Sequence, residues 1–222
     1  MRFTVKGQRA MRLWSLVPAA LDMMRKVFTN FIGGMRMEEH QKLFKLASIL
    51  LQYPEREWLE DDRLFYEISE LANHTARKRF LQFLDYAKTK EIDELCELYV
   101  RTFDLSDRTT MYLTYYLFGD QKERGQALLK LKEAFRLAGL ELEGNELPDY
   151  LPLILEFAAA APVNDAKNVL LAHQKAIKGL ADRLQEVDHP YFFVLDGCLA
   201  GLAAFFEETR GVDIPMRAEE AT

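Results

Sequence analysis

The chain has 222 residues, 49% of them hydrophobic, which is enough for one large domain with a core of its own. This composition excludes a chain that is mainly disordered. Glycine and proline are scarce, at 11 and 7 residues, which favours helices over a β-sandwich or barrel. Cys96 and Cys198 lie far apart and support neither a zinc module nor a disulfide framework, so we interpret both as buried thiols in a reducing cytoplasm.

The net charge of −6 is divided unevenly along the chain. Residues 1–36 hold seven Lys or Arg and one Asp, a net charge of +6, whereas residues 37–222 hold 22 Lys or Arg and 34 Asp or Glu, a net charge of −12. An acidic body repels phosphate backbones, so we expect no nucleic-acid partner. A partner that is apolar and mildly basic would suit this body.

We interpret residues 1–36 as a basic N-terminal extension, disordered or added by a misassigned start, with Met37 beginning the working domain. Asp22, Arg25 and Lys26 interrupt its apolar stretch, and no run approaches the roughly 20 apolar residues of a membrane span. Two alternatives to this interpretation remain open. One is a basic amphipathic segment that lies on a membrane surface, and the other is a cleaved targeting peptide.

Apolar positions after Met37 recur at helical spacing, and no segment shows the sustained alternation of a strand. Proline-containing stops at Tyr53-Pro54 and His189-Pro190 end two of the helices. We therefore predict an all-α domain over residues 37–222, folded as a single globular bundle of about nine helices. The expected helices cover about 38–53, 56–72, 75–88, 91–103, 109–118, 121–138, 152–160, 165–187 and 191–208.

The sequence carries no recognisable catalytic or metal-binding pattern. Glu186 and His189 form one Glu-x-x-His pair, whereas a di-iron bundle needs two such pairs and two further Glu residues. The sequence contains no His-Glu-x-x-His, Gly-x-Ser-x-Gly or P-loop motif. We predict a protein that is not an enzyme and that binds no metal.

Aromatic residues are concentrated between Tyr99 and Phe118. Three tyrosines within five positions of one helix, Tyr112, Tyr115 and Tyr116, cannot all point inward, because adjacent positions diverge by about 100°. The cluster is either ordinary core with an amphipathic rim or a groove whose rings take an apolar helix of a partner.

A second unusual segment runs from Glu146 to Pro152 and carries Asp149 and Tyr150 between Pro148 and Pro152. Two prolines four residues apart make a stiff loop. The segment is either a helix N-terminus, with Asp149 as the cap and Pro152 in the first turn, or a binding edge. In the second reading Asp149 points outward, toward a cationic or N–H group of a partner peptide.

Several motifs of the chain occur together in one known family. They are the opening LASILLQYPEREW at 46–58, the ELPDYLPL box at 146–153 and the residues Tyr99, Phe103, Asp104, Gly119, Arg124 and Gly125. With these motifs, the stretch from Tyr99 to Ala158 resembles the respiratory nitrate reductase assembly chaperones of the NarJ and NarW type, which belong to the all-helical chaperones of dimethyl sulfoxide reductase-group molybdoenzymes. The wider class has a histidine where this chain has Tyr150.

The resemblance implies a cytoplasmic chaperone that binds the catalytic (alpha) subunit of respiratory nitrate reductase through its N-terminal segment. Such a chaperone promotes insertion of the molybdenum guanine dinucleotide cofactor before the complex docks on its membrane anchor, with transient membrane proximity and no stably bound cofactor of its own. The rival reading is a helical ligand-binding or regulatory module with an aromatic-lined pocket. The residues expected to bind the partner peptide are Tyr112, Tyr115, Tyr116, Glu146, Pro148, Asp149, Tyr150 and Pro152.

Overall fold

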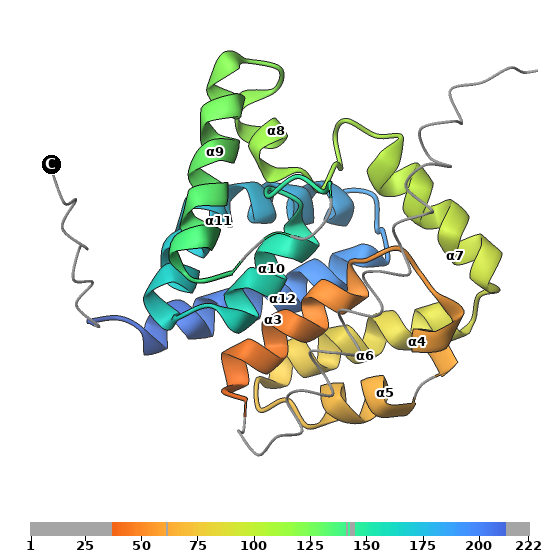
Figure 1. Cartoon of the computed structure of the whole chain (residues 1–222). Helices are drawn as coiled ribbons and strands as arrows, with labels where there is room; N and C mark the ends of the chain where they lie inside the picture. Colours follow the sequence, from red (N-terminus) through yellow and green to blue (C-terminus); the bar gives the residue numbers. More distant parts are fainter. Residues whose placement is uncertain (1–36, 61, 141, 143–144, 212–222) are drawn as a thin grey trace, which may run out of the picture. The chain divides into compact units, whose positions relative to one another are not determined.

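The computed structural model describes residues 37–60, 62–140, 142 and 145–211. The expectations for residues 1–36 therefore lie outside the described residues. The chain divides between Glu38 and Glu39, and all the structure below belongs to the second unit. Its elements are α3 (Glu39–Leu50), α4 (Arg56–Glu60), α5 (Asp62–Ser69), α6 (His74–Lys88), α7 (Ile92–Tyr99), the π-helix η1 (Val100–Asp104), α8 (Leu113–Phe118), α9 (Lys122–Leu137), α10 (Leu151–Ala160), α11 (Val163–Gln185) and α12 (Tyr191–Glu208) (Figure 1).

The all-α prediction is confirmed, because the described residues contain helices and one isolated bridge but no strand. Three predicted helices differ in detail. The helix expected over 109–118 begins only at Leu113, with Tyr112 as its N-cap residue. The segment expected over 56–72 is split into α4 and α5, and the helix expected over 91–103 changes to π geometry after Tyr99. The change is marked by the N–H of Leu105, which donates to the carbonyl of Val100 five residues earlier at 3.0 Å.

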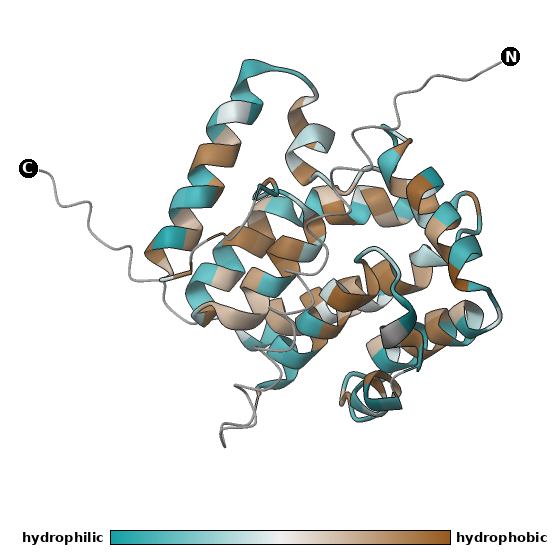
Figure 2. Cartoon of the chain, turned by 45° about the vertical axis from the view of Figure 1, so that its right-hand side comes forward, coloured by the Kyte–Doolittle hydropathy of each residue, from teal (hydrophilic) through white to brown (hydrophobic). Residues whose placement is uncertain are grey.

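The core is built where α3, α10, α11 and α12 pack on one another and where α6 covers α12. α10 and α12 are apolar on most of their faces, as expected of helices surrounded by neighbours. Figure 2 shows hydrophobic residues on the sides of the helices that face one another and hydrophilic residues toward the outside. No described helix combines the length and apolar character that crossing a bilayer requires.

Two polar contacts between α3 and α10 fix the start of α10. Lys45 of α3 forms an ion pair with Glu156 of α10, and both side chains are largely buried. The hydroxyl of Ser48 donates to the backbone carbonyl of Pro152 at 2.8 Å. Because Pro152 ends the stiff loop that the sequence singles out, these contacts fix the position of that loop against the core.

Candidate partner-binding site

The segment that leads into α10 runs beside the start of α8 (Figure 1). Tyr112 and Tyr150 form an isolated antiparallel bridge between the two segments. The N–H of Leu113 donates to the carbonyl of Asp149 at 3.0 Å, and a second backbone bond of 2.9 Å closes the other side of the bridge. The two segments that the sequence singles out are therefore one structural unit.

The Asp149 side chain points into the protein and is 0% exposed. Its Oδ2 accepts hydrogen bonds from the backbone N–H of Thr114 at 3.1 Å and from the Thr114 hydroxyl. The carboxylate thus caps the first turn of α8, where unpaired N–H groups and the helix dipole favour a negative charge. The prediction that Asp149 points outward is wrong, because α8 supplies these donors on the inner side.

Asp149 also does not cap the helix that follows it. Tyr150 is the N-cap residue of α10, and Pro152 lies in the first turn as expected. Within the described part of the chain, Oδ1 of Asp149 has no hydrogen-bond partner. Asp149 is therefore a buried link between two segments and not a free surface carboxylate.

Arg124, at the start of α9, completes this link. Its Nε donates to the Thr114 hydroxyl at 3.3 Å, and its Nη2 lies 3.8 Å from Oδ2 of Asp149. Its guanidinium also lies 5.3 Å from the centre of the Tyr115 ring. The motif residue Arg124 thus joins α8, α9 and the loop before α10, whereas a Cβ added at the neighbouring Gly125 would meet nothing.

The motif residue Gly119 ends α8 with a φ of +54°, a backbone conformation that side chains disfavour. The glycine therefore has a local reason to be there, since it allows the chain to turn from α8 into α9.

Tyrosine hydroxyls connect the core to this unit. The Tyr99 hydroxyl donates to the carbonyl of Leu51 at 3.2 Å and lies 2.7 Å from the Tyr150 hydroxyl. The Tyr112 hydroxyl donates to Oε1 of Glu146 at 2.9 Å. Burial raises the pKa of Tyr99 and Tyr150 well above its ordinary value, so both phenols stay neutral. Tyr150 thus fills a hydrogen-bonding position in the interior of the site.

Phe103 packs its ring edge-on against Tyr99 and Tyr191, at 5.0 and 4.9 Å between ring centres. The next residue, Asp104, turns toward solvent at the end of η1. Partial loss of hydration and the negative charge of Glu146 raise the pKa of Asp104. η1 and the loop before α10 therefore bring two carboxylates to the same place.

Two leucines lie directly beside these carboxylates in the chain and remain accessible to water. Leu105 is 76% exposed and Leu147 is 36% exposed. We define the acidic edge as the five residues Asp104, Leu105, Tyr112, Glu146 and Leu147. Among the described residues, neither Asp104 nor Glu146 forms an ion pair. The acidic edge therefore presents unpaired negative charge beside apolar and aromatic surface.

The other two expected tyrosines lie elsewhere. Tyr115 lies against Arg124, and Tyr116 packs against α11. A Cβ added at Gly179 would lie 2.6 Å from Cζ of Tyr116, and the guanidinium of Arg183 lies 4.4 Å from the centre of the Tyr116 ring. The three tyrosines diverge, as their spacing predicts, so they do not form one groove.

Leu105 and Leu147 are absent from the sequence-based prediction. The signal that could have found them is a leucine next to an acidic residue outside the regular helices. Pro148, which is among the residues expected to bind the partner peptide, is buried in the structure.

No group of three or more His, Cys, Asp or Glu side chains within the described ranges is placed to hold a metal ion. In the Glu-x-x-His pair, Nε2 of His189 lies 2.9 Å from the Thr102 hydroxyl, and the His189 ring stacks on Tyr191. This histidine is therefore engaged in structural contacts.

The described residues thus form an all-helical fold with a charged edge beside exposed leucines. Residues 70–195 match the family described as nitrate reductase delta subunit. The chain is 39% identical over 171 residues to the probable nitrate reductase molybdenum cofactor assembly chaperone NarJ of Bacillus subtilis, covering 76% of this chain and 92% of that protein. The chain belongs to this family.

Two further relatives differ in the share of their own length that this chain covers. The chain is 28% identical over 162 residues to the probable chaperone NarW of Escherichia coli, covering 71% of this chain and 67% of NarW. It is 38% identical over 152 residues to the nitrate reductase-like protein NarX of Mycobacterium tuberculosis, covering 67% of this chain but only 22% of NarX. A domain of this kind thus also occurs within a much longer chain.

Proposed function

We propose that this chain is a cytoplasmic chaperone for the assembly of respiratory nitrate reductase. It binds the apo catalytic subunit and promotes insertion of the molybdenum guanine dinucleotide cofactor before the complex docks on its membrane anchor. Two of the relatives are named as probable nitrate reductase molybdenum cofactor assembly chaperones, and these names support this role. The cofactor belongs to the client enzyme, and the chaperone itself performs no chemical step.

The observation that carries the proposal is the acidic edge. Asp104 and Glu146 carry unpaired charge beside Leu105 and Leu147, and Tyr112 adds a half-buried ring to the same surface. A basic, amphipathic helix at the N-terminus of the client has complementary chemistry, because its cations face the carboxylates and its apolar face covers the leucines. The site is therefore proposed on the edge and not on Asp149 itself.

The framework under the edge makes it a firm platform. Asp149, Thr114 and Arg124 hold the loop on α8, and the Tyr99–Tyr150 pair fastens it to the core. Residues that are already ordered lose little conformational freedom on binding, which favours affinity. The expected partner-binding residues Asp149, Tyr150 and Pro152 thus act as positioning residues in this proposal.

The rival reading, a ligand pocket lined by the aromatic cluster, has less support. The rings of Tyr53, Tyr99, Phe103 and Tyr191 pack edge-on against one another at 4.9 to 6.0 Å between centres. Aromatic rings in mutual contact fill the space that a small molecule would need. The part of the cluster formed by Tyr99 and Phe103 is therefore interpreted as core.

Release follows from a population shift. The client segment is accessible in the open apo enzyme and becomes buried when the cofactor closes the client fold, so the chaperone binds only the immature state. A ligand that binds only one state of a protein stabilises that state, and it loses its binding site when the protein leaves that state.

Calorimetric titration of the full chain with a peptide of the client N-terminus, at low and high salt, tests the proposal. We expect micromolar or tighter affinity that weakens as salt rises, because exposed charges are screened. Cofactor-loaded catalytic subunit, used as the control ligand, should not bind. Equal affinity for apo and loaded subunit would contradict the proposed role.

A further inference from the structure

A concave site lies at the start of α3, away from the acidic edge. A cavity of about 230 Å³ opens where the start of α3, the corner before α6 and the end of α12 meet. Its floor is apolar and includes Leu43, Gly201 and Phe205, and the carboxyl groups of Glu39 and Glu208 lie among its lining residues. The volume is below the roughly 300 to 1,000 Å³ of pockets for drug-sized ligands, which suits a single side chain.

The polar residues that line this cavity are Glu39, His40, Asn73 and Glu208. Oε1 of Glu39 accepts the N–H of Asn73 at 3.0 Å, which fixes this carboxylate and leaves Oε2 available. Asn73 is itself held, because its Oδ1 caps α6 at 3.0 Å and its Nδ2 donates to Ala200 at 3.3 Å. Glu208 forms no ion pair within the described residues.

An apolar floor with carboxylates beside it has a specific complement. Arginine and lysine bury their aliphatic stems on apolar surface while the charged head stays at the rim. An anionic group would be repelled by the two carboxylates, and a purely apolar side chain would leave both without a cation. The chemistry therefore selects a long cationic side chain.

We propose that this cavity is a second anchoring site of the chaperone, which takes one arginine or lysine side chain of the apo catalytic subunit. The inference rests on the proposed function for the identity of the partner. Glu39 begins α3, and Leu51, just beyond the end of α3, accepts the hydrogen bond that holds Tyr99. The twelve residues of α3 span about 18 Å, so the two sites lie toward opposite ends of this helix.

The first test measures the affinity of the full chain for the apo catalytic subunit. Glu208→Gln removes the charge at the cavity, and Glu207→Gln is its matched control because Glu207 pairs with Arg210 at 2.7 Å and does not line the cavity. The expected result is an affinity about threefold lower for Glu208→Gln and unchanged for Glu207→Gln, as for one partly exposed charge pair. Equal affinities of the two variants would overturn the second anchor, while leaving the proposed function intact.

A second measurement does not depend on the client. N-acetyl-arginine amide is titrated into the full chain to tens of millimolar, with the neutral isostere N-acetyl-citrulline amide as the control. In NMR spectra, the backbone amide resonances of Asn73 and Gly201 should shift when the arginine derivative is added but not when the citrulline derivative is added. Glu208→Gln should reduce the shift. Absence of a shift, or the same shift with citrulline, would overturn the cavity as a cation site even if the apo subunit binds elsewhere.

Discussion

At the scale of single residues, the direction of the Asp149 carboxylate decides what its motif does. A proline on each side indicates a stiff loop, but stiffness does not say whether the carboxylate faces water or protein. The N–H groups at the start of α8 and the guanidinium of Arg124 draw it inward. The sequence does not predict this contact, because Thr114 and Asp149 are 35 residues apart in the chain.

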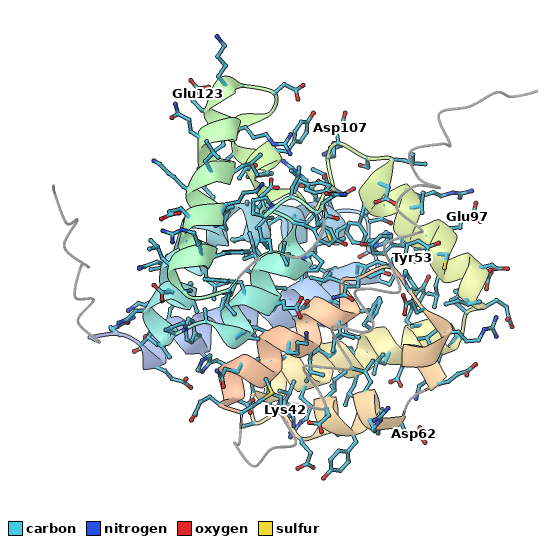
Figure 3. The ribbon with its side chains drawn as sticks, in the orientation of Figure 1. Lys42, Tyr53, Asp62, Glu97, Asp107 and Glu123 are labelled. Atoms are coloured by element: carbon cyan, nitrogen blue, oxygen red, sulfur yellow. The ribbon has the colours of Figure 1, made fainter. Side chains whose placement is uncertain are left out.

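Asp149→Ala should lower stability and should affect client binding only through loss of the platform. The change leaves the Thr114 N–H without its acceptor and Arg124 without its nearby charge, at a cost of about 1 to 3 kcal/mol in the free energy of unfolding. Urea denaturation measures this, with Asp107→Ala as control because Asp107 lies exposed in the loop between η1 and α8 (Figure 3). Equal stability of the two variants would contradict the capping role.

The stability of the fold should fall as the solution becomes acidic. Burial lowers the pKa of His173 and His189 in the folded chain, whereas both titrate near about 6.5 when unfolded. Below about pH 6.5 the unfolded state therefore binds more protons, and each histidine costs up to about 1.4 kcal/mol per pH unit until its folded pKa is reached.

Urea denaturation at neutral and acidic pH checks this prediction. His189→Gln should reduce the dependence on pH, because the uncharged amide does not titrate. The exposed His74 provides the control, and His74→Gln should keep the slope of the parent protein. A slope that is the same in all three proteins would refute the role of His189.

At the scale of elements, helical periodicity predicts most of the fold. α6, α9, α11 and α12 begin and end within a few residues of the predicted positions. The split of 56–72 into α4 and α5 could not be predicted, because the apolar spacing continues across it. The apolar spacing also does not predict the π geometry of η1, in which Thr102 and Phe103 are buried.

The packing of α8 on α11 depends on Gly179, which has no side chain. Gly179→Ala should cost about 1 to 3 kcal/mol of stability, because the new Cβ overlaps the Tyr116 ring. In a Tyr116→Ala background the same change should cost much less, and a double-mutant cycle measures the difference.

Gly125→Ala is the matched control for this change, since a Cβ there meets nothing and alanine is the better helix former. It should be neutral or stabilise α9 by up to about 1 kcal/mol. If Gly179→Ala also stabilised the fold, the close contact with Tyr116 would be disproved.

At the scale of the whole molecule, the candidate site depends on which segments meet. The sequence identifies both segments, Tyr99 to Phe118 and Glu146 to Pro152, because aromatic and proline content are local properties. It does not predict that the bridge between Tyr112 and Tyr150 joins them, or that Leu105 and Leu147 are the exposed apolar residues beside the two carboxylates. Tertiary contact decides both points.

Client binding should depend on pH through Asp104. Its pKa is raised in the free chaperone by lost hydration and by Glu146, and a cation of the client would lower it. Affinity should therefore fall as the pH drops through the pKa of free Asp104, when protonation removes the attraction. Titrations with the client peptide at two pH values check this, and Asp104→Asn should abolish most of the dependence while leaving a weaker affinity.

The most direct test of the acidic edge is a charge reversal with a matched control three residues away. Asp104→Lys and Asp107→Lys change the net charge of the chain equally, but only Asp104 belongs to the edge. Calorimetry with the client peptide should show an affinity at least about tenfold lower for Asp104→Lys, equivalent to about 1.4 kcal/mol, and a near-native affinity for Asp107→Lys. Equal effects of the two reversals, or none, would contradict the acidic edge as the binding site.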